Sequence, residues 1–393
     1  MATRPPPTKK REWSLRSRAV RGVLYQVVAI GLIGFVVWFL AHNTMENMRV
    51  RGIQSGFDFL LQPAGFDIGE RMIPYESIDA YWRAFLIGLL NTLRVAIIGV
   101  ILTTILGTLL GVGRFSNNAI VRGLCYGYVE LFRNVPILLQ LLVWYLVLTE
   151  ALPDPGSPLS LGGLVFLSKG GLSFPSPIAD PGHAWTALGA VAGIAAAFFY
   201  ARWARRQFEA TGRARATFWP GVAMVIVLAL LGWVAGGMPT AWQIPEVSDV
   251  AVNGGSEVTP EFIAVLLGLV LYTSAFVAEV VRAGIQSVSS GQSEAASALG
   301  LVRGLQMRLV ILPQALRVII PPMTNQYLNL TKNSSLAVAI GYPDVVSISN
   351  TAINQTGRAV ECIAIIMGVY LFTSLSTSGF MNWYNKRSAI KER

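Results

Sequence analysis

Eight long apolar stretches dominate this sequence and constrain what it can fold into. Each is about 20 residues long, the length of helix needed to cross the roughly 30 Å hydrocarbon core of a bilayer. Only 13% of the residues are charged, against about 25% in an average globular chain. We therefore predict an all-α polytopic membrane protein with about eight transmembrane helices. The expected spans lie near residues 24–41, 86–112, 129–149, 184–201, 218–237, 261–281, 316–338 and 360–381.

The distribution of Lys and Arg predicts how these spans are oriented. If the basic N-terminal tail is cytoplasmic, cytoplasmic segments hold 22 of the 31 Lys and Arg residues and external segments hold six. Cytoplasmic loops of membrane proteins carry such an excess. We therefore expect both termini in the cytoplasm and the first apolar stretch retained as a span, since it is longer than a signal-peptide core. Basic residues at span ends, with no single patch, also argue against a nucleic-acid partner.

Residues of the kinds that catalyse reactions or bind metals are few. Cys125 and Cys362 lie far apart in apolar sequence, and the only histidines, His42 and His183, fall in expected loops. We therefore expect no catalytic residues and no metal site. The sequence also lacks a Walker-type phosphate loop, so this chain should not itself hydrolyse ATP.

The expected spans divide into a core and additions to it. Residues 150–260 have the character of an insertion, because they combine Pro/Gly/Ser-rich outer loops with two Ala- and Gly-rich spans. An even number of inserted spans leaves the orientation of the following core unchanged. The predicted segments are a basic tail (1–23), an extra span with an outer loop (24–85), the first part of the core (86–149), the insertion (150–260), the second part of the core (261–385) and a C-terminal tail (386–393).

The cytoplasmic segment 290–313 carries the strongest local signals. Glu294 would lie in the first turn of a helix, where a negative charge suits the helix dipole, and Gly300 is a natural helix stop. A second short helix is expected over 301–311, until Pro313 breaks it. Two short helices joined at a glycine would form a compact cytoplasmic knob with a small-residue face that another protein could approach closely.

This segment resembles the EAA loop of ABC importer permeases. The family pattern is Glu-Ala-Ala, three residues, Gly, nine residues, an aliphatic residue, any residue, and Leu-Pro. The matching residues are Glu294, Ala295, Ala296, Gly300, Leu312 and Pro313, with Val310 where Ile is usual. The resemblance implies that the segment is a coupling loop that docks onto an ATP-binding subunit. The alternative is an ordinary amphipathic loop between two spans.

Four further segments are similar to the polar amino acid (histidine/glutamine-type) permeases within these importers. They are residues 91–93, 128–140, 278–285 and 332–336. The resemblance covers 86–140 and 261–385 and implies the five-helix core of a type I ABC importer permease. The extra span and the insertion resemble the long permease subunit of general L-amino acid transporters.

The resemblance implies a function, partners and a location. The chain would be the permease subunit of an ATP-driven importer of polar L-amino acids such as Glu, Gln, Asp and Asn, in a bacterial inner membrane. Its expected partners are two ATP-binding subunits, which would hold ATP and Mg, a second permease subunit and a periplasmic amino-acid-binding protein. A related permease is the expected second subunit, and a homodimer stays open. This chain itself would bind no cofactor and would not be an enzyme.

A polar stripe distinguishes the seventh expected span. It consists of Asn325, Asn329, Lys332 and Asn333, followed by the hydroxyls of Ser334 and Ser335. These spacings place the stripe on one helical face, and the adjacent prolines 321–322 should bend or break the helix. Such a stripe is typical of a hydrated substrate pathway, in which Lys332 and the hydroxyls could meet a carboxylate. The alternative is a polar contact between helices.

Charges inside other spans occur three residues apart, as Glu130 with Arg133 and Glu279 with Arg282. Each pair could neutralise itself locally. An ion-coupled secondary transporter, the main alternative function, would be expected to have unpaired acids at mid-membrane. A membrane enzyme would need a nucleophile and a base, and the sequence offers no such combination. These observations favour the importer.

Overall fold

The computed structural model describes residues 18–50, 52, 55–213 and 215–388. The tails predicted at 1–23 and 386–393 therefore lie mostly outside the described residues. The long helices are α1 (Arg18–Val50), α2 (Tyr81–Gly113), α3 (Ala119–Asn134), α4 (Ile137–Leu146), α5 (Gly182–Thr211), α6 (Phe218–Ala235), α7 (Pro260–Gln286), α10 (Leu312–Asn333), α11 (Val345–Thr356) and α12 (Ala359–Ser388). The shorter ones are η1 (Asp58–Leu61), η2 (Val147–Ala151), α8 (Ser290–Ala298), α9 (Arg303–Gln306), η3 (Met307–Ile311) and η4 (Ser334–Ile340).

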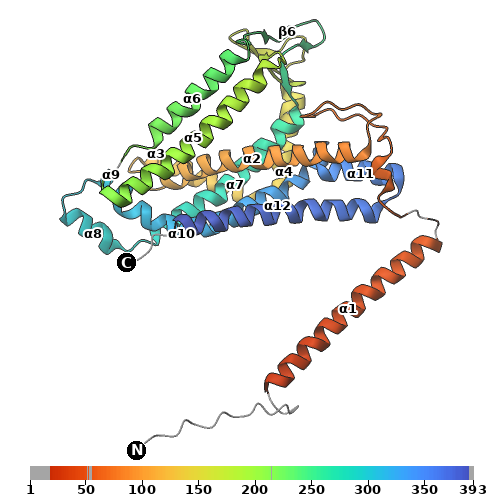
Figure 1. Ribbon diagram of the computed structural model, residues 1–393, viewed down its shortest axis with the longest axis horizontal. Helices are drawn as coiled ribbons and strands as arrows, with labels where there is room; N and C mark the ends of the chain where they lie inside the picture. Colours follow the sequence, from red (N-terminus) through yellow and green to blue (C-terminus); the bar gives the residue numbers. More distant parts are fainter. Residues whose placement is uncertain (1–17, 51, 53–54, 214, 389–393) are drawn as a thin grey trace, which may run out of the picture.

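Within the described residues, six helices are long and apolar enough to cross a membrane. Two bent helix pairs, α3 with α4–η2 and the run from α9 to η4 with α11, raise the number to eight if each pair is one span. The prediction of an all-α polytopic membrane protein with about eight spans is confirmed. Figure 1 shows the core helices running alongside one another, with α1 standing apart and α5–α6 above them.

The core is centred on α7, which packs along α2 and against α4 and α10. Its closest approach to α2 is made through glycines, because a Cβ at Gly107 would lie 2.5 Å from the side chain of Val277. Small residues let membrane helices approach until their backbones are in contact, and packing of this kind is a main source of stability between helices in lipid. In α12, by contrast, the side chains are mostly exposed, as expected for a helix at the lipid boundary.

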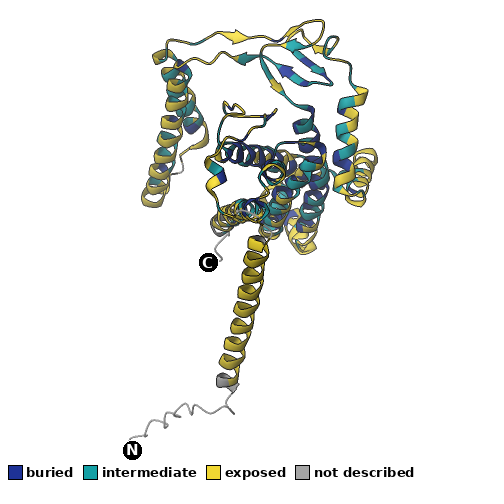
Figure 2. Cartoon of the chain, turned by 90° about the vertical axis from the view of Figure 1, so that its right-hand side faces the viewer, coloured by how far each residue is buried: buried dark blue, intermediate teal, exposed yellow. Residues whose placement is uncertain are grey.

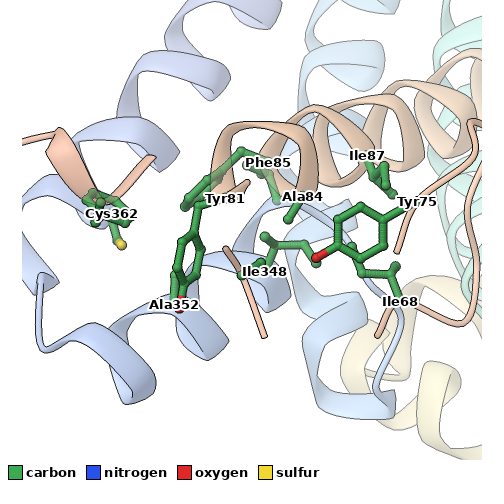
Figure 3. Close-up of a cluster of buried hydrophobic side chains, with 12 residues drawn as sticks. Ile68, Tyr75, Tyr81, Ala84, Phe85, Ile87, Ile348, Ala352 and Cys362 are labelled. Carbon is green, nitrogen blue, oxygen red and sulfur yellow. The ribbon is translucent and has the colours of Figure 1, made fainter. Parts of the chain in front are cut away.

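The end of the core opposite α8 is closed by the loop before α2. Phe59, Ile68 and Tyr75 from this loop are buried against α2 and α11. Figure 3 shows Ile68 and Tyr75 beside Ile87 and Ile348, with Tyr81 and Ala352 farther along the same cluster. The loop is therefore a packed part of this end of the bundle.

The insertion forms a helical hairpin capped by small β-sheets. The strands are β1 (Leu159–Leu161), β2 (Val165–Ser168), β3 (Gly171–Phe174), β4 (Ser176–Pro177), β5 (Trp242–Gln243), β6 (Glu246–Val247), β7 (Val252–Asn253) and β8 (Ser256–Val258). They form one antiparallel sheet in the order β1-β2-β3-β8 and two strand pairs, β4-β5 and β6-β7. Since β3 pairs with β8, with Leu172 opposite Val258, the two outer loops of the insertion join into one unit. These strands were not predicted.

The third expected span, 129–149, is not one helix. The chain turns by 103° between α3 and α4, at Val135, which is extended (φ −94°, ψ 127°). The cause is Pro136, because a residue before proline is driven out of the helical region. The prediction of a continuous helix here was wrong.

The seventh expected span breaks at a different place from the one predicted. Helix α10 passes through Pro321 and Pro322 without ending. Helix α10 passes after Asn333 into the 3-10 helix η4, which ends at Gly341 (φ +79°). The bend of 49° comes there, between η4 and α11. The hydroxyl of Ser334 donates to the carbonyl of Thr331 at 2.7 Å, and that of Ser335 to the carbonyl of Lys332 at 2.8 Å. These bonds compete for the carbonyls of the last helical turn.

Several helices are longer than the expected spans, α1 and α5 most of all. Helix α1 includes His42, which had been assigned to a loop, and Figure 2 shows α1 exposed along its length. Helix α5 continues ten residues beyond the expected end at 201. His183 lies in its first turn.

Candidate functional site

The knob between α7 and α10 is built around Gly300. Helix α8 starts at Ser290, earlier than expected, so Glu294 lies beyond the first turn. The N–H of Gly300 donates to Ser297 O at 2.9 Å, and the N–H of Leu301 donates to Ala296 O at 3.1 Å. This pair of bonds is a Schellman motif, which requires a left-handed residue. Gly300 supplies it with φ +75°, so the predicted helix stop is confirmed.

The second arm of the knob is continuous with the membrane helix. Helix α9 leads into the π-helix η3 and then directly into α10, with Pro313 inside the first turn of α10. The expectation that Pro313 would break the second short helix was wrong. The wider π turn accommodates a residue that lacks an N–H. As a result, the second arm is an extension of α10.

Two glutamines hold the arms together. The amide of Gln306 donates to Leu301 O at 2.7 Å and to the hydroxyl of Ser297 at 2.9 Å. The amide of Gln314 donates to Gln292 of α8 at 3.2 Å and to Val310 O at 3.0 Å. A displacement of α8 is therefore transmitted to α10 through bonds to both ends of the second arm.

The knob presents apolar side chains to its surroundings. The exposed ones are Leu299, Val302, Leu305 and Leu309. Of the residues that match the family pattern, Glu294, Ala295 and Gly300 are exposed, Leu312 and Pro313 are half-buried and Ala296 is buried. Exposed apolar patches occur at sites that contact other proteins or the membrane.

Below the knob, α10 packs on α7. Ala315, Ile319 and Met323 form a buried cluster with Val277 and Val281. The contact is close, because a Cβ at Gly284 of α7 would lie 2.2 Å from Ile319 Cγ1. A shift of α10 therefore carries α7 with it.

An ion-pair cluster lies at the end of α7 that leads into the knob. Glu279 pairs with Arg282, as predicted, and also accepts a hydrogen bond from Arg114, the residue after α2, at 2.5 Å. Arg133 of α3 lies 3.7 Å from Glu279, while the carboxylate of Glu130 accepts from Asn134 at 3.4 Å. Instead of pairing with Glu130, Arg133 joins α3 to this cluster. The role of Arg114 was missed because it lies 165 residues away in the sequence.

The polar stripe lies on one face of α10. Asn325, Asn329 and Lys332 are exposed, and Asn333 next to them is half-buried. Ser334 is buried with its hydroxyl bound to a backbone carbonyl, and Ser335 is half-buried and bound in the same way. The structure thus brings Lys332 and the asparagines together, while the serine hydroxyls bind carbonyls in the last turn of α10.

The opposite, buried side of α10 is bound to the core. Tyr327 and Thr104 of α2 share a hydroxyl–hydroxyl bond at 2.8 Å. Polar residues at membrane depth are costly unless they meet protein or water. The exposed stripe therefore requires a neighbour outside this chain or a hydrated cavity.

The end of the bundle opposite the knob is held together by charged residues that sequence reasoning did not single out. The buried Glu70 forms an ion pair with Arg94 of α2, and its carboxylate accepts from the N–H of Thr259 at 3.1 Å. Glu70 also helps to line a hollow of about 300 Å³ that includes Glu261 and Thr351. These residues fasten the loop before α2 to the start of α7.

A second fastening joins the same loop to α12. Arg358 donates to Asp58 at 3.0 Å and to Gly56 O at 2.7 Å, and Glu361 accepts from the N–H of Gly56 at 2.7 Å. The hydrogen bond from Arg358 holds the pKa of Asp58 below its ordinary value. Burial raises the pKa of Glu257 in β8, and the nearby Glu70 adds to this shift.

Among the described residues, no group of three or more His, Cys, Asp or Glu side chains could hold a metal ion. Both cysteines are buried and unpaired. The features that remain to explain a function are the knob, the ion cluster and the stripe.

A comparison with protein families matches a profile described as "binding-protein-dependent transport system inner membrane component" over residues 99–211 and 210–389. The chain is 46% identical to the general L-amino acid transport system permease protein AapQ of Rhizobium johnstonii, over 97% of this chain and 96% of that protein. It is 39% identical to the glutamate/glutamine/aspartate/asparagine transport system permease protein BztB of Rhodobacter capsulatus, over 95% of each. A solved amino acid ABC transporter with histidines shares 20% identity over 78% of this chain and 95% of that one, with a TM-score of 0.46.

Proposed function

This chain belongs to the family of binding-protein-dependent transport system inner membrane components, and from this premise we propose how it works. It is a multi-span permease subunit of an amino-acid ABC importer. The knob of residues 290–313 receives a separate ATP-binding subunit, which holds ATP and Mg. Its movement opens a pathway along the stripe of α10.

The observation that carries this proposal is the continuity of the knob with α10. The second arm passes through η3 into α10 with no intervening coil. A partner that moves the exposed Leu299 and Val302 acts on a lever whose other arm is a membrane helix. The tight contact between Gly284 and Ile319 then carries the motion into α7.

The exposed stripe supports a second permease subunit. Exposing a face that bears Asn325, Asn329 and Lys332 to lipid would cost free energy. Across from a related chain, the same face would line a shared polar pathway. Lys332 would then attract the carboxylate of an amino acid, and the asparagines would supply donors and acceptors to its polar groups.

The substrate class rests on the relatives. AapQ and BztB are by name permease proteins for general L-amino acids and for glutamate, glutamine, aspartate and asparagine. We therefore assign polar L-amino acids to this transporter. The excess of Lys and Arg on one side supports cytoplasmic termini. With that orientation the β-sheet unit would lie on the outside, where a periplasmic binding protein would deliver the substrate.

Copurification of the ATP-binding subunit, together with amino-acid uptake, tests this function. Gly300→Asp adds a side chain at φ +75°, a left-handed conformation that glycine adopts most easily in a Schellman motif. The matched control is Gly304→Asp, which makes the same change in the first turn of α9, where an acidic residue is favoured. We expect Gly300→Asp to lose both the subunit and uptake, and Gly304→Asp to retain them. Normal association and uptake in Gly300→Asp would refute the docking role of the knob.

A further inference from the structure

The inner end of the α5–α6 hairpin is richer in arginine than any other surface of the insertion that the structure describes. Helix α5 has 30 residues and α6 has 18. The apolar part of α5, residues 182–201, is about 30 Å long, which matches the hydrocarbon core of a bilayer. Its arginines begin at Arg202, the next residue. They therefore lie at the depth of the lipid headgroups.

The arginine cluster consists of Arg202, Arg205, Arg206, Arg213 and Arg215, all of them exposed. The first three stand at i, i+3 and i+4 and so share one face of α5. Glu209, the one acid of this helix end, pairs with Arg205 at 3.4 Å, and both side chains are exposed. An exposed pair of this kind contributes little to stability. Five arginines against one glutamate leave the cluster with a strong positive excess.

The same face of α5 is hollowed. A hollow of about 350 Å³ is lined by Phe198 and Ala201 on the membrane side and by Arg202, Arg205, Arg206 and the paired Glu209 on the aqueous side. An apolar wall that leads directly into a basic one suits an amphipathic ligand. A phosphodiester could sit between the guanidinium groups while an acyl chain follows Phe198 into the bilayer.

Aromatic side chains surround the cluster at the same depth. Trp203, Phe218 and Trp219 are exposed, and the guanidinium of Arg215 lies 5.0 Å from the ring of Trp203. Tryptophan is enriched where membrane helices meet the headgroups. The cation–π contact holds Arg215 beside the helix, where it can meet a headgroup together with the other arginines.

The hairpin is set up to be surrounded by lipid. Helices α5 and α6 pack on each other through glycines, since a Cβ at Gly189 would lie 2.2 Å from Leu228 O and one at Gly193 2.6 Å from Val225 Cα. Among the described elements, neither helix shares a comparable interface with the core helices. The flanks of the arginine cluster are therefore open to the membrane.

We propose that the arginine cluster and the hollow beside Phe198 form a binding site for the headgroup of an anionic phospholipid in the cytoplasmic leaflet. Such a lipid would anchor the hairpin at a defined depth. A membrane lipid explains the apolar wall of the hollow, which an acidic soluble protein or free phosphate would leave unused.

The test uses the full chain in its assembled complex, in nanodiscs of phosphatidylcholine with increasing phosphatidylglycerol. Native mass spectrometry reports the phosphatidylglycerol retained per chain. Since each basic residue near a membrane surface contributes roughly a fivefold factor, Arg202→Gln, Arg205→Gln and Arg206→Gln together should weaken retention on the order of a hundredfold. The corresponding triple lysine variant keeps the charge and should retain the lipid, which separates charge loss from misfolding.

A second triple variant, Lys9→Gln, Lys10→Gln and Arg11→Gln, is the charge-matched control and should weaken retention less than the α5 variant. Equal losses in both glutamine variants would reveal only non-specific attraction and overturn the site. Unchanged retention in the α5 variant would do the same. Displacement of the lipid by inorganic phosphate at equal concentration, or loss of the ATP-binding subunit in place of the lipid, would assign the cluster to a different ligand.

Discussion

The ion cluster at the end of α7 supports a prediction that can be worked out from its geometry. Glu279→Gln removes the carboxylate that holds Arg114, whose side chain is only 4% exposed. The other contact of that guanidinium is the ring of Tyr126, 3.9 Å away, and its Nε already lacks a hydrogen-bond partner. The substitution therefore leaves this buried cation without the carboxylate that neutralises it.

Breaking one side of a buried ion pair costs about 3–5 kcal/mol. Glu279 is 26% exposed, and glutamine keeps one acceptor oxygen, so we expect a loss of about 2 kcal/mol in the free energy of unfolding. Arg133→Gln is the matched control, because Arg133 is 3.7 Å from Glu279 and 37% exposed. Its loss should stay below about 1 kcal/mol.

Titration of the purified chain with a denaturing detergent measures these free energies. Glu279→Gln should also cost less in an Arg114→Gln background than in the wild type, because the two residues share one interaction. If the losses were simply additive, Arg114 would not be coupled to Glu279. If Arg133→Gln cost as much as Glu279→Gln, the smaller weight given to Arg133 would be wrong.

Three further substitutions follow from the same structure. Gly300→Ala should destabilise the knob by about 1 kcal/mol, because its only cost is a left-handed backbone. Gly304→Ala in α9 should stabilise the knob. Hydrogen exchange of the knob amides should therefore change in opposite directions in the two variants, and equal changes would contradict the Schellman assignment. Lys332→Ala should abolish most amino-acid uptake while the complex still assembles, and Lys332→Arg should retain part of it; normal uptake by the alanine variant would remove Lys332 from the pathway. Asp58 has a lowered pKa because of Arg358, so this contact stabilises the fold above the unfolded-state pKa and is lost as pH falls through the folded-state pKa. The thermal midpoint should accordingly fall more between about pH 5 and about pH 3 in the wild type than in Asp58→Asn, and parallel curves would count against the contact.

Local sequence rules predicted the features that depend on neighbouring residues. The apolar stretches predicted the spans. Gly300 predicted the end of α8, because a helix end with a left-handed residue depends on the residues of a single turn. The same rules contained the signal for the turn at Pro136, which was overlooked within an apolar run. At Pro321 the proline rule predicted a bend or break that does not end the helix. This proline lies on the exposed side of α10, where the helix tolerates it.

Features that depend on distant partners could not be predicted. Glu70 meets Thr259 across 189 residues and Arg358 meets Asp58 across 300, and no periodicity within a segment reports such contacts. The strand pairs of the insertion have the same origin, since strands of two to four residues carry little pattern of their own. The stripe was visible because its residues share one helix, but the burial of Ser334 depends on how η4 packs into the core.

The central claim is that the knob is where the ATP-binding subunit docks, and photocrosslinking tests it most directly. A benzophenone amino acid at Leu299, which is 79% exposed on the knob, is compared with one at Ile120, which is 73% exposed at the start of α3. In the assembled complex, irradiation should yield an adduct between this chain and the ATP-binding subunit from position 299 and none from position 120. An adduct from position 120 alone, or none from position 299, would contradict the account.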